Sequence, residues 1–526
     1  MTFPIRIGCG VLMGALLASC TTQTAQQPNV PIAAQITPAQ TQPSRTLSAH
    51  DLAVLNRLSW GVSPALAQHA ATEGMPRFIA QQLHPSPNDG LPPEIQAQLN
   101  ALTLVNEPVD QLAHELSNER RQVVMAAADP QARMMGLRDL QQKLNEVARE
   151  AGTRSFLRDL YSQNQLQELT TWFWFNHFNV DLRKKDVRLF VADYENSAIR
   201  PHALGKFRDL LSATLHHPAM LRYLDNDQNA NQRINENYAR EIMELHTLGV
   251  NGGYTQKDVQ ELARILTGVG VNETESRPEL RPALQSQYVR AGTFEFNPNR
   301  HDYGDKIFLG HAIKGRGLAE VDEAIDILAR HPSTAHFISR ELATFFVSDD
   351  PPPALVDRMA ETFRKTDSDI ASVLATAFAS PEFDASLKTK FKDPMHYVMS
   401  ALRLAYNDKP ILNVQPIRNW LNRLSEPLYG HETPDGYALG AAAWSGPGAM
   451  ATRFEIARAI GSSGAGLFRP DAPDAAERPG FPQIAGPVLA SVGPTLAAGT
   501  NETLSQAISP QDWNTLFLSS PDFMHW

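Results

Sequence analysis

Apolar residues recur at helical spacing along most of the chain. Leu52, Leu55 and Leu58 show the three-to-four-residue interval that forms the buried face of a helix, and Ser48 is placed to cap its start. Residues 110–170 are rich in Ala, Leu, Gln and Arg, which is typical of solvent-facing helices. The pattern predicts a mainly α fold, a large multi-helix domain with few short strands. The expected strands lie near residues 287–290, 293–296 and 306–309.

Composition excludes several classes of protein. Hydrophobic residues make up 42% of the 526 residues and charged residues 20%, as in ordinary globular proteins. The net charge of −10 gives no basic field, so we expect no nucleic-acid partner. The chain has two cysteines, which excludes a disulfide scaffold and a Cys-rich zinc or iron–sulfur site.

The first twenty residues look like an export signal. Arg6 gives a short basic start, and residues 7–18 form an apolar stretch too short to span a bilayer. The stretch ends in Leu-Ala-Ser before Cys20, which resembles the box where a bacterial peptidase cuts and the cysteine receives a lipid. We therefore expect residues 1–19 to be a lipoprotein signal peptide and Cys20 to be lipidated. An ordinary secretory signal is the alternative.

Residues 20–46 follow as a predicted flexible tether, since they are rich in Thr, Gln, Pro and Ala and have no periodicity. Thr21 is not an aspartate, so the expected location is the cell envelope, on the outer membrane. The lipid must supply the anchoring, because an acidic chain gains no attraction from anionic lipids. Residues 47–526 form the predicted helical body, with a Gly/Pro-rich loop at about 462–500.

One pattern occurs three times in this body: an apolar helical run, a small or polar residue, a proline and an apolar anchor. It predicts a helix that stops at the proline and packs its anchor on the core. The occurrences are residues 209–221, 372–383 and 515–523.

Nine of the sixteen histidines fall between residues 177 and 336, together with dense polar runs. An aromatic run, Trp-Phe-Trp-Phe, precedes His177 at the start of this region. Trp172, Trp174 and His177 are candidates for binding the flat face of a sugar, and burial in the core is the alternative.

The polar run from Asp225 to Glu236 resembles an EF-hand loop. Asp225, Asp227, Asn229 and Glu236 take positions 1, 3, 5 and 12, where oxygen ligands surround calcium. Ala230 stands where the loop needs glycine, which counts against it. A plain polar loop is the alternative. Calcium is the one cofactor that the sequence suggests, and otherwise we expect none.

Residues 235–249 predict a helix that ends at a glycine. Asn237, Glu241 and Glu244 share one stripe with Arg240 beside it, while His246 falls on the apolar side. Two carboxylates three residues apart suit acid/base chemistry if one is neutral and the other ionised. An ordinary surface ion pair is the alternative.

A polar loop at residues 296–306 carries His301 and Asp302, which would suit an acid/base or ligand pair. A solvated turn is the alternative. The sequence has no nucleophile elbow, His-Glu-x-x-His helix, Walker A loop or Gly-rich dinucleotide fingerprint, so these enzyme classes lose support.

Several long motifs resemble the bacterial family called domain of unknown function 1800. They include NENYAREIMELHTLGVNGGYTQKDVQELARILTG (235–268), FNPNRHDYGDKIFLG (296–310) and PDGYALGAAAWSGPGAM (434–450). The resemblance covers nearly all of the chain after residue 46. It implies a mostly helical extracytoplasmic protein, often encoded beside a partner with a sulfatase-like fold. No catalytic residue carries over from it.

Three hypotheses follow. The first is a hydrolase or lyase that acts on an extracytoplasmic polymer such as a polysaccharide, with Glu241, Glu244, His301 and Asp302 in acid/base roles. The second is a non-catalytic binding or assembly lipoprotein that acts with a partner protein. The third is a calcium-stabilised scaffold.

Overall fold

The computed structural model of the protein describes residues 47–126, 129–406, 409–469, 480–491 and 493–526. The predicted signal peptide, the lipidation site Cys20 and the predicted tether lie outside these ranges. All described residues fall within one unit of the chain, Arg45–Trp526. No helix in this part of the chain combines the length and the apolar character needed to cross a membrane.

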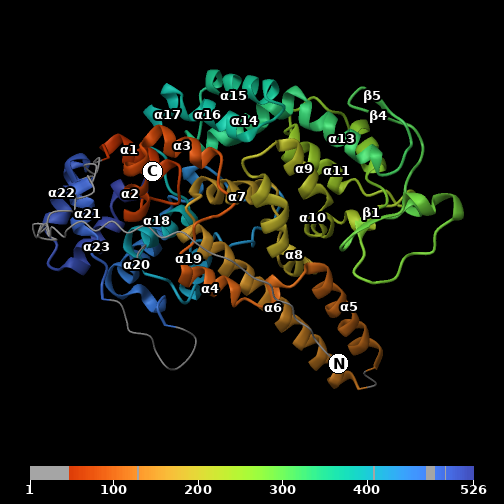
Figure 1. Ribbon diagram of the computed structural model, residues 1–526, viewed down its shortest axis with the longest axis horizontal. Coiled ribbons are helices and arrows are strands. Elements are labelled where there is room, and N and C mark those ends of the chain that lie inside the picture. The colour runs from red at the N-terminus through yellow and green to blue at the C-terminus, as the bar shows by residue number, and fades with distance from the viewer. Residues whose placement is uncertain (1–46, 127–128, 407–408, 470–479, 492) are drawn as a thin grey trace, which may run out of the picture. The chain divides into compact units, whose positions relative to one another are not determined.

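Helices make up most of the unit, which confirms the mainly α prediction (Figure 1). The α-helices of the described residues are α1(Ala49–Arg57), α2(Pro64–Glu73), α3(Met75–Leu83), α4(Pro93–Asn100), α5(Val109–Ala126), α6(Pro130–Tyr161), α7(Gln165–His177), α8(Val187–Asp193), α9(Phe207–His216), α10(Pro218–Tyr223), α11(Asn237–Glu241), α12(Gln256–Ile265), α13(Ala319–Arg330), α14(Pro332–Phe346), α15(Pro353–Lys365), α16(Ile370–Phe378), α17(Pro381–Ser386), α18(Pro394–Tyr406), α19(Gln415–Arg423), α20(Pro447–Ser463), α21(Ala485–Ser491), α22(Ala498–Ser505), α23(Pro510–Leu518) and α24(Pro521–Met524).

Local sequence signals explain several helix starts. Ser48 caps α1 in a capping box with Asp51, whose carboxylate accepts from the Ser48 backbone N–H. In each of the three repeated motifs the proline is also the first residue of a second, short helix. The side chain before each proline caps that second helix. These cap and proline pairs are His217–Pro218, Ser380–Pro381 and Ser520–Pro521.

The strands are few and short, as expected. A three-stranded antiparallel sheet has the order β1-β3-β2, with Phe296 opposite Val269 on one side and Val289 on the other. A separate hairpin pairs β4 with β5. The strands are β1(Val269–Val271), β2(Val289–Ala291), β3(Phe294–Phe296), β4(Lys306–Phe308) and β5(His311–Ile313). The pattern located β2, β3 and β4 but not β1 and β5, whose three residues each are too short to show a period.

The segment predicted as a Gly/Pro-rich loop, 462–500, contains more structure than expected. Helix α21 lies within it, and α22 begins before its end. Residues 470–479 and 492 lie outside the described part of the chain. Short helices of this kind are stabilised by packing, so their glycines and prolines mask them in the sequence.

The two ends of the described chain meet at Arg57. This side chain, the last residue of α1, is fully buried and donates hydrogen bonds to the backbone oxygens of Phe346 and Ser386, both at 2.8 Å, and to that of Trp526. Figure 1 accordingly shows the first helices, in red, beside the last helices, in blue.

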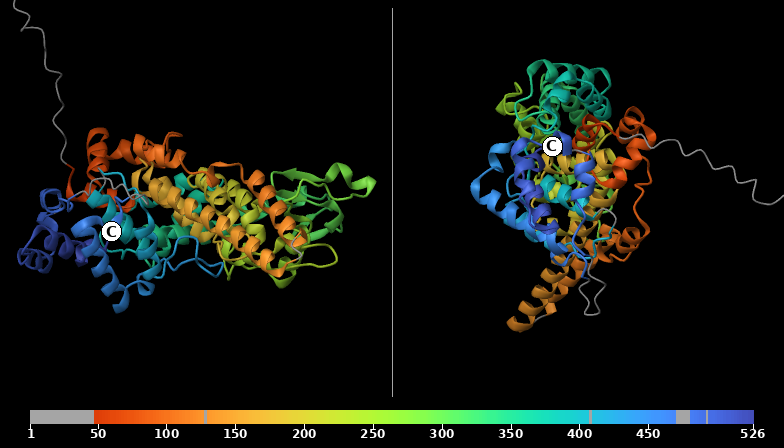
Figure 2. Two further views of the ribbon diagram at one scale, coloured as in Figure 1. Left: turned by 90° about the horizontal axis from the view of Figure 1, so that it is seen from below. Right: turned by 90° about the vertical axis from the view of Figure 1, so that its left-hand side faces the viewer.

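Helices α5 and α6 form an antiparallel hairpin that projects from its neighbours (Figure 2). The second half of α6 enters the core and carries several buried polar residues there, including Arg154, Ser155 and Asp159. Two π-helical turns also carry acidic residues: η3(Tyr194–Ile199) holds Glu195 and η6(Ile242–Thr247) holds Glu244. Turns of this kind occur frequently at functional sites.

Candidate functional site

Glu241 and Glu244 lie where α11 passes into η6, and the structure brings their carboxylates together. The Arg240 guanidinium lies 3.3 Å from Glu244 and 3.3 Å from Glu236. Half-burial raises the pKa of Glu241, the nearby charge of Glu244 raises it further, and Arg240 opposes both effects. The pair is therefore asymmetric, with Glu241 shifted toward its protonated form and Glu244 engaged in an ion pair.

Segment 431–437 lies beside this pair. The charge of Asp435 adds to the rise in the pKa of Glu241. The Tyr223 hydroxyl donates to the backbone oxygen of Glu432 at 2.7 Å, and burial raises the pKa of Tyr223. Asn237 is exposed, and its amide donates to the backbone oxygen of Leu224 at 3.3 Å. The Asn237 side chain is therefore open to solvent, and its hydrogen bond holds the start of α11 to the segment that precedes it.

His301 and Asp302 face different partners. The His301 ring is completely buried, with one nitrogen 2.8 Å from the backbone oxygen of Thr267 and the other 2.9 Å from the Glu320 carboxylate. Lys306 contacts the second oxygen of Glu320 at 2.5 Å. Asp302 instead accepts from Arg264 at 2.8 Å. Both residues hold the 296–306 loop in place rather than presenting an acid/base pair.

The 225–236 loop, which precedes the helix of Glu241 and Glu244, contacts the 296–306 loop of His301 and Asp302. The Asn231 N–H donates to the Arg300 backbone oxygen at 2.8 Å, and the Arg300 guanidinium donates to the Asp227 backbone oxygen at 2.8 Å. The side chains of the four candidates nevertheless have separate partners. Glu241 and Glu244 form one group, and His301 and Asp302 belong to the network around Glu320 and Arg264.

The aromatic run occupies the core. Trp174 is completely buried and donates through its indole N–H to the backbone oxygen of Ala203 at 2.9 Å. Trp172 is half-buried and stacks on Phe345. His177 lies 3.1 Å from the backbone oxygen of His246, and burial lowers the pKa of His177 to about 4. These contacts favour the core interpretation, although Trp172 also lines a cavity described below.

The predicted calcium ligands point to protein cations. Asp225 pairs with Lys184 at 2.8 Å and with Lys185 at 2.6 Å. Asp227 pairs with Arg222 at 2.7 Å, and Glu236 with Arg240. The Asn229 side chain donates to the backbone oxygen of Ala263 and accepts from the Asn235 N–H. Among the described residues no three His, Cys, Asp or Glu side chains are grouped to hold a metal ion.

Four carboxylates that the sequence did not single out line an internal cavity of about 20 Å³, which is room for a single water-sized molecule. Each of these residues is at most 9% exposed. They are Asp159 of α6, Glu168 of α7, Glu195 of η3 and Glu426 after α19. We call this cavity the carboxylate chamber.

The four acids of the carboxylate chamber differ in their pKa shifts and in their partners. Burial raises the pKa of Asp159 and of Glu426 well above the ordinary value and also raises that of Glu195. Glu168 instead pairs with Arg200 at 2.6 Å. The Glu426 Oε2 accepts from the Met395 N–H at 2.8 Å, but its Oε1 has no hydrogen-bond partner in the described structure.

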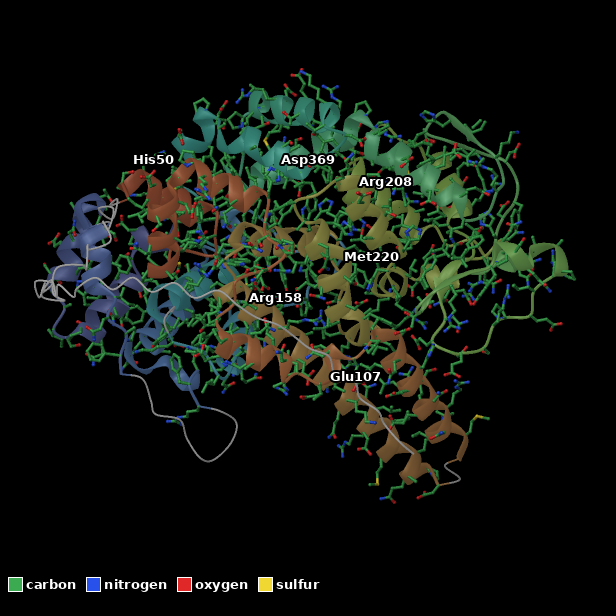
Figure 3. All side chains as sticks on the ribbon, in the orientation of Figure 1. His50, Glu107, Arg158, Arg208, Met220 and Asp369 are labelled. Atoms are coloured by element: carbon green, nitrogen blue, oxygen red, sulfur yellow. The ribbon has the colours of Figure 1, made fainter. Side chains whose placement is uncertain are left out.

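Arg158, labelled in Figure 3, lines the same chamber; its Nε lies 3.7 Å from the Asp89 carboxylate but makes no hydrogen bond in the described structure. Its Nη1 donates to Asn196 at 2.6 Å. Among the described residues the chamber thus contains an acceptor on Glu426 without a hydrogen bond, and a donor on Arg158 that makes an ionic contact but no hydrogen bond. Groups of this kind cost stability unless something binds them.

A second, larger cavity of about 330 Å³ contains four arginines. Leu182 and Phe156 add apolar surface, and the side chains of Asn145 and Asn422 add amides. We call this cavity the arginine groove. The four arginines are Arg149, Arg183, Arg188 and Arg418.

Two of these arginines are bound by neutral groups. Arg188 donates to Asn145 at 2.6 Å and to Gln141 at 2.7 Å. Arg418 donates to the backbone oxygens of Ala148, at 3.3 Å, and Arg149. Burial lowers the pKa of Arg418 to about 10, which leaves it charged at neutral pH.

The other two arginines are neutralised. Arg149 pairs with Glu146 and Arg183 with Asp181, the latter at 3.0 Å. Glu146 also interacts with Arg418, and that interaction helps to lower the pKa of Glu146. The groove therefore carries an excess of positive charge even though the whole chain is acidic.

Tyr429 belongs to both cavities. Its hydroxyl donates to Glu195 at 2.7 Å inside the chamber, and Tyr429 and Leu428 also line the arginine groove. The Tyr429 backbone has φ of 60°, a left-handed conformation that is costly for a residue with a side chain. Strain of this kind persists where surrounding structure requires it, often at functional sites.

Sequence analysis missed both cavities because their residues are far apart in the chain. Glu168 lies in α7, the helix that carries the aromatic run. A single acid among apolar residues was the sequence signal that could have pointed to the chamber. In both cavities residues of 145–195 meet residues of 395–437, and nothing in the local pattern of either segment indicates which of them will meet.

A model of the family described as "Protein of unknown function (DUF1800)" matches residues 53–525. The search of curated proteins finds no match. The search of solved structures finds none either.

Proposed function

The chain belongs to the DUF1800 family, and we propose that it is a lipid-anchored protein of the cell envelope that binds an acidic polysaccharide in the arginine groove. The observation that supports this most directly is that Arg188 and Arg418 hydrogen-bond to neutral oxygens, which leaves the groove with an excess of positive charge. Guanidinium groups form paired hydrogen bonds with carboxylates and sulfates, and partial burial strengthens those bonds. An anion that enters the groove would offer these guanidinium groups charged acceptors in place of neutral amide and backbone oxygens.

The rest of the groove suits a sugar chain. The hydrocarbon surfaces of Leu182, Phe156 and Tyr429 match the apolar faces of pyranose rings, and Asn145 and Asn422 offer amides to hydroxyl groups. A volume of about 330 Å³ lies within the range of small-ligand sites and would hold one or two sugar units. The ends of a longer chain would extend into solvent.

The location remains a proposal that rests on the sequence. Lipidation at Cys20 and a tether over 20–46 would hold the helical body at the surface of the outer membrane, where acidic polysaccharides occur. The sulfatase-like partner that the family resemblance implies would then act on the same class of anionic polymer.

Binding to defined polymers tests this function. Purified protein should bind polygalacturonate and dextran sulfate and should not bind neutral dextran of the same length, as measured by titration calorimetry. The affinity for the charged polymers should fall steeply between 50 and 200 mM salt, since arginine–anion contacts are screened. Equal binding to neutral dextran would contradict the proposal.

A second candidate function is hydrolysis or elimination of the bound polymer, with Glu241 as the acid. It is favoured by the raised pKa of Glu241 beside Glu244, the asymmetry that a general acid requires. Segment 427–437 connects the two places, since Tyr429 and Gly430 line the groove and Asp435 lies by Glu241. Glu244 would act as the base.

Release of reducing ends from polygalacturonate measures this activity. We expect Glu241→Gln to lower the rate by about 100-fold or more, because it removes the transferable proton. Glu361→Gln, which alters an exposed glutamate paired with Lys365, is the matched control and should leave the rate unchanged. If the wild-type protein releases no ends while it binds the polymer, the binding function stands alone.

A further inference from the structure

A third cavity, of about 150 Å³, lies between the first and last helices of the described chain. Its wall is mostly apolar and includes Leu52 of α1, Leu404 of α18, Val488 of α21, Phe517 of α23 and Phe523 of α24. A cavity of this size and character accommodates a molecule as large as benzene. Neither the groove nor the chamber shares its lining.

Lys392 and Ser400 are two potentially reactive side chains that line this apolar cavity. The Lys392 Nζ lies 3.0 Å from the Ser400 Oγ, and both residues line the cavity while being at most 4% exposed. Ser400 lies on α18, and Lys392 precedes the same helix by two residues. Backbone bonds from Lys392 to Met524 and from Trp526 to Lys390 fix this segment against the C-terminal residues.

The surroundings of Lys392 favour a neutral amine. The ring of Phe523, whose centre lies 3.8 Å from the Nζ, would stabilise a cation, but Lys392 has no carboxylate partner in the described structure. Burial lowers the pKa of Lys392 to about 7, and the charge of Arg453 adds to this effect. The neighbouring Asp393 carboxylate faces His396 at 2.6 Å instead. A neutral lysine 3.0 Å from a serine hydroxyl is placed to act as its general base.

We propose that Lys392 and Ser400 form the catalytic dyad of a second site, which hydrolyses esters of small apolar acyl groups. The 150 Å³ cavity would hold the acyl chain, with the ester carbonyl at Ser400. The side-chain amide of Asn56 lines the same cavity and supplies an N–H donor for the oxyanion. The site is independent of the arginine groove and of polymer binding.

The reaction balances with water as the only co-reactant. The Lys392 Nζ accepts the Ser400 Oγ proton as Oγ bonds to the carbonyl carbon, so the hydroxyl exchanges its 3.2 Å bond to the Tyr397 backbone oxygen for one to Lys392. The tetrahedral intermediate collapses, the bond to the alcohol oxygen breaks, and that oxygen receives the proton from Lys392. Water then attacks the acyl-serine, Lys392 accepts its proton and returns it to Oγ, and the carboxylic acid leaves.

Two reagents test the site on the full chain: p-nitrophenyl butyrate as the ester and a fluorophosphonate that labels activated serines. We expect turnover of the ester and a single fluorophosphonate adduct, mapped to Ser400 by peptide mass spectrometry. Ser400→Ala should abolish both. Lys392→Met should lower the rate of ester hydrolysis and of labelling by about 100-fold or more.

Matched variants separate chemistry from folding. Ser339→Ala removes another fully buried serine, on α14, and Lys390→Met removes a buried lysine two residues away; both should keep activity and labelling. Lys392→Arg puts a permanent cation in place of the neutral amine and should be inactive, and its thermal unfolding transition shows whether the variant is folded at the assay temperature. No adduct, an adduct at another residue, or Ser400 labelling that persists in folded Lys392→Met would overturn the proposal.

Discussion

The Tyr429 hydroxyl donates a 2.7 Å hydrogen bond to the Glu195 carboxyl group, and the same side chain lines the arginine groove. One residue therefore separates a positive groove from a chamber of buried acids. Its backbone φ of 60° shows that the surrounding contacts hold it in a strained conformation.

Tyr429→Phe removes the 2.7 Å hydrogen bond to the buried Glu195 Oε2 and leaves that oxygen with the longer 3.3 Å bond from the Ser155 hydroxyl. We expect the free energy of unfolding to fall by about 1–3 kcal/mol, measured by urea denaturation. Tyr288→Phe is the matched control, because Tyr288 makes a similar 2.9 Å bond to Glu295 but is only half-buried, and Glu295 keeps a 2.8 Å bond from the Asn272 amide. An equal loss of stability in both variants would show that burial in the chamber adds nothing to the Tyr429–Glu195 bond.

Glu426→Gln should stabilise the protein at pH 8. Burial raises the pKa of Glu426 in the folded state, with Asp393 raising it further, so the folded protein holds a proton that the unfolded chain releases near the ordinary value of 4.5. The stability from Glu426 is thus complete below pH 4.5 and is lost as pH rises through the folded-state pKa. Glutamine does not ionise, so the free energy of unfolding of the variant should exceed that of the wild type by roughly 1–3 kcal/mol at pH 8.

Glu320→Gln should change the free energy of unfolding in the opposite direction at pH 8, measured in the same way. His301 and Lys306 lower the pKa of Glu320, so its contribution is present above pH 4.5 and disappears as pH falls through the folded-state value. This variant should be destabilised at pH 8 and approach the wild type in acid. Urea unfolding at pH 4, 6 and 8 measures both, and a shift of the same sign in both at pH 8 would refute this assignment.

The free energy of unfolding should fall at acidic pH because of two buried histidines. Burial lowers the pKa of His177 from 6.5 to about 4 and also lowers that of His246, so the unfolded chain takes up protons that the folded protein does not. Stability from these groups is present above pH 6.5 and falls between pH 6.5 and 4, by about 1.4 kcal/mol per pH unit for each group that stays neutral.

His177→Phe isolates this effect. The variant loses stability at every pH because His177 contacts the backbone of His246, but its stability should decline less steeply between pH 6.5 and 4. Exposed His336→Phe, whose ring lies 3.8 Å from Asp357, should retain the wild-type slope. An unchanged slope in His177→Phe would show that the histidine is protonated in the folded state.

Arg57→Leu should destabilise the protein by about 3–5 kcal/mol, because the backbone oxygens of Phe346, Ser386 and Trp526 lose a shared buried donor. Thermal unfolding measures the loss. Arg77→Leu, which removes an exposed i,i+4 partner of Glu73, should cost less than about 1 kcal/mol.

Local sequence patterns predicted what depends on neighbouring residues. The serine cap of α1, the helix ending at Gly249 and the burial of His246 follow from periodicity and capping, and the structure has all three. The same periodicity placed Glu241 and Glu244 together. The family and the mainly α class were also predicted correctly.

Long-range contacts were beyond those patterns. His301 and Asp302 are adjacent in sequence and look like a pair, yet Glu320 and Arg264 draw them apart. Asp225 and Asp227 have the spacing of calcium ligands, but lysines of segment 184–185 lie against them. Lys392 and Ser400 carry no motif, and their chemistry arises from burial by helices at both ends of the chain.

The dissociation constant of polygalacturonate for the double variant Arg188→Gln/Arg418→Gln tests most directly whether the arginine groove binds an acidic polymer. Each lost charge-assisted contact is worth about 1.5–3 kcal/mol, so the constant should rise about 100-fold or more at 50 mM salt. The control Arg208→Gln/Arg358→Gln removes two arginines paired elsewhere, with Asp326 and Glu382, and should bind like the wild type; Arg208 is labelled in Figure 3. Equal weakening in both double variants would show attraction to overall charge alone and would contradict a site in the groove.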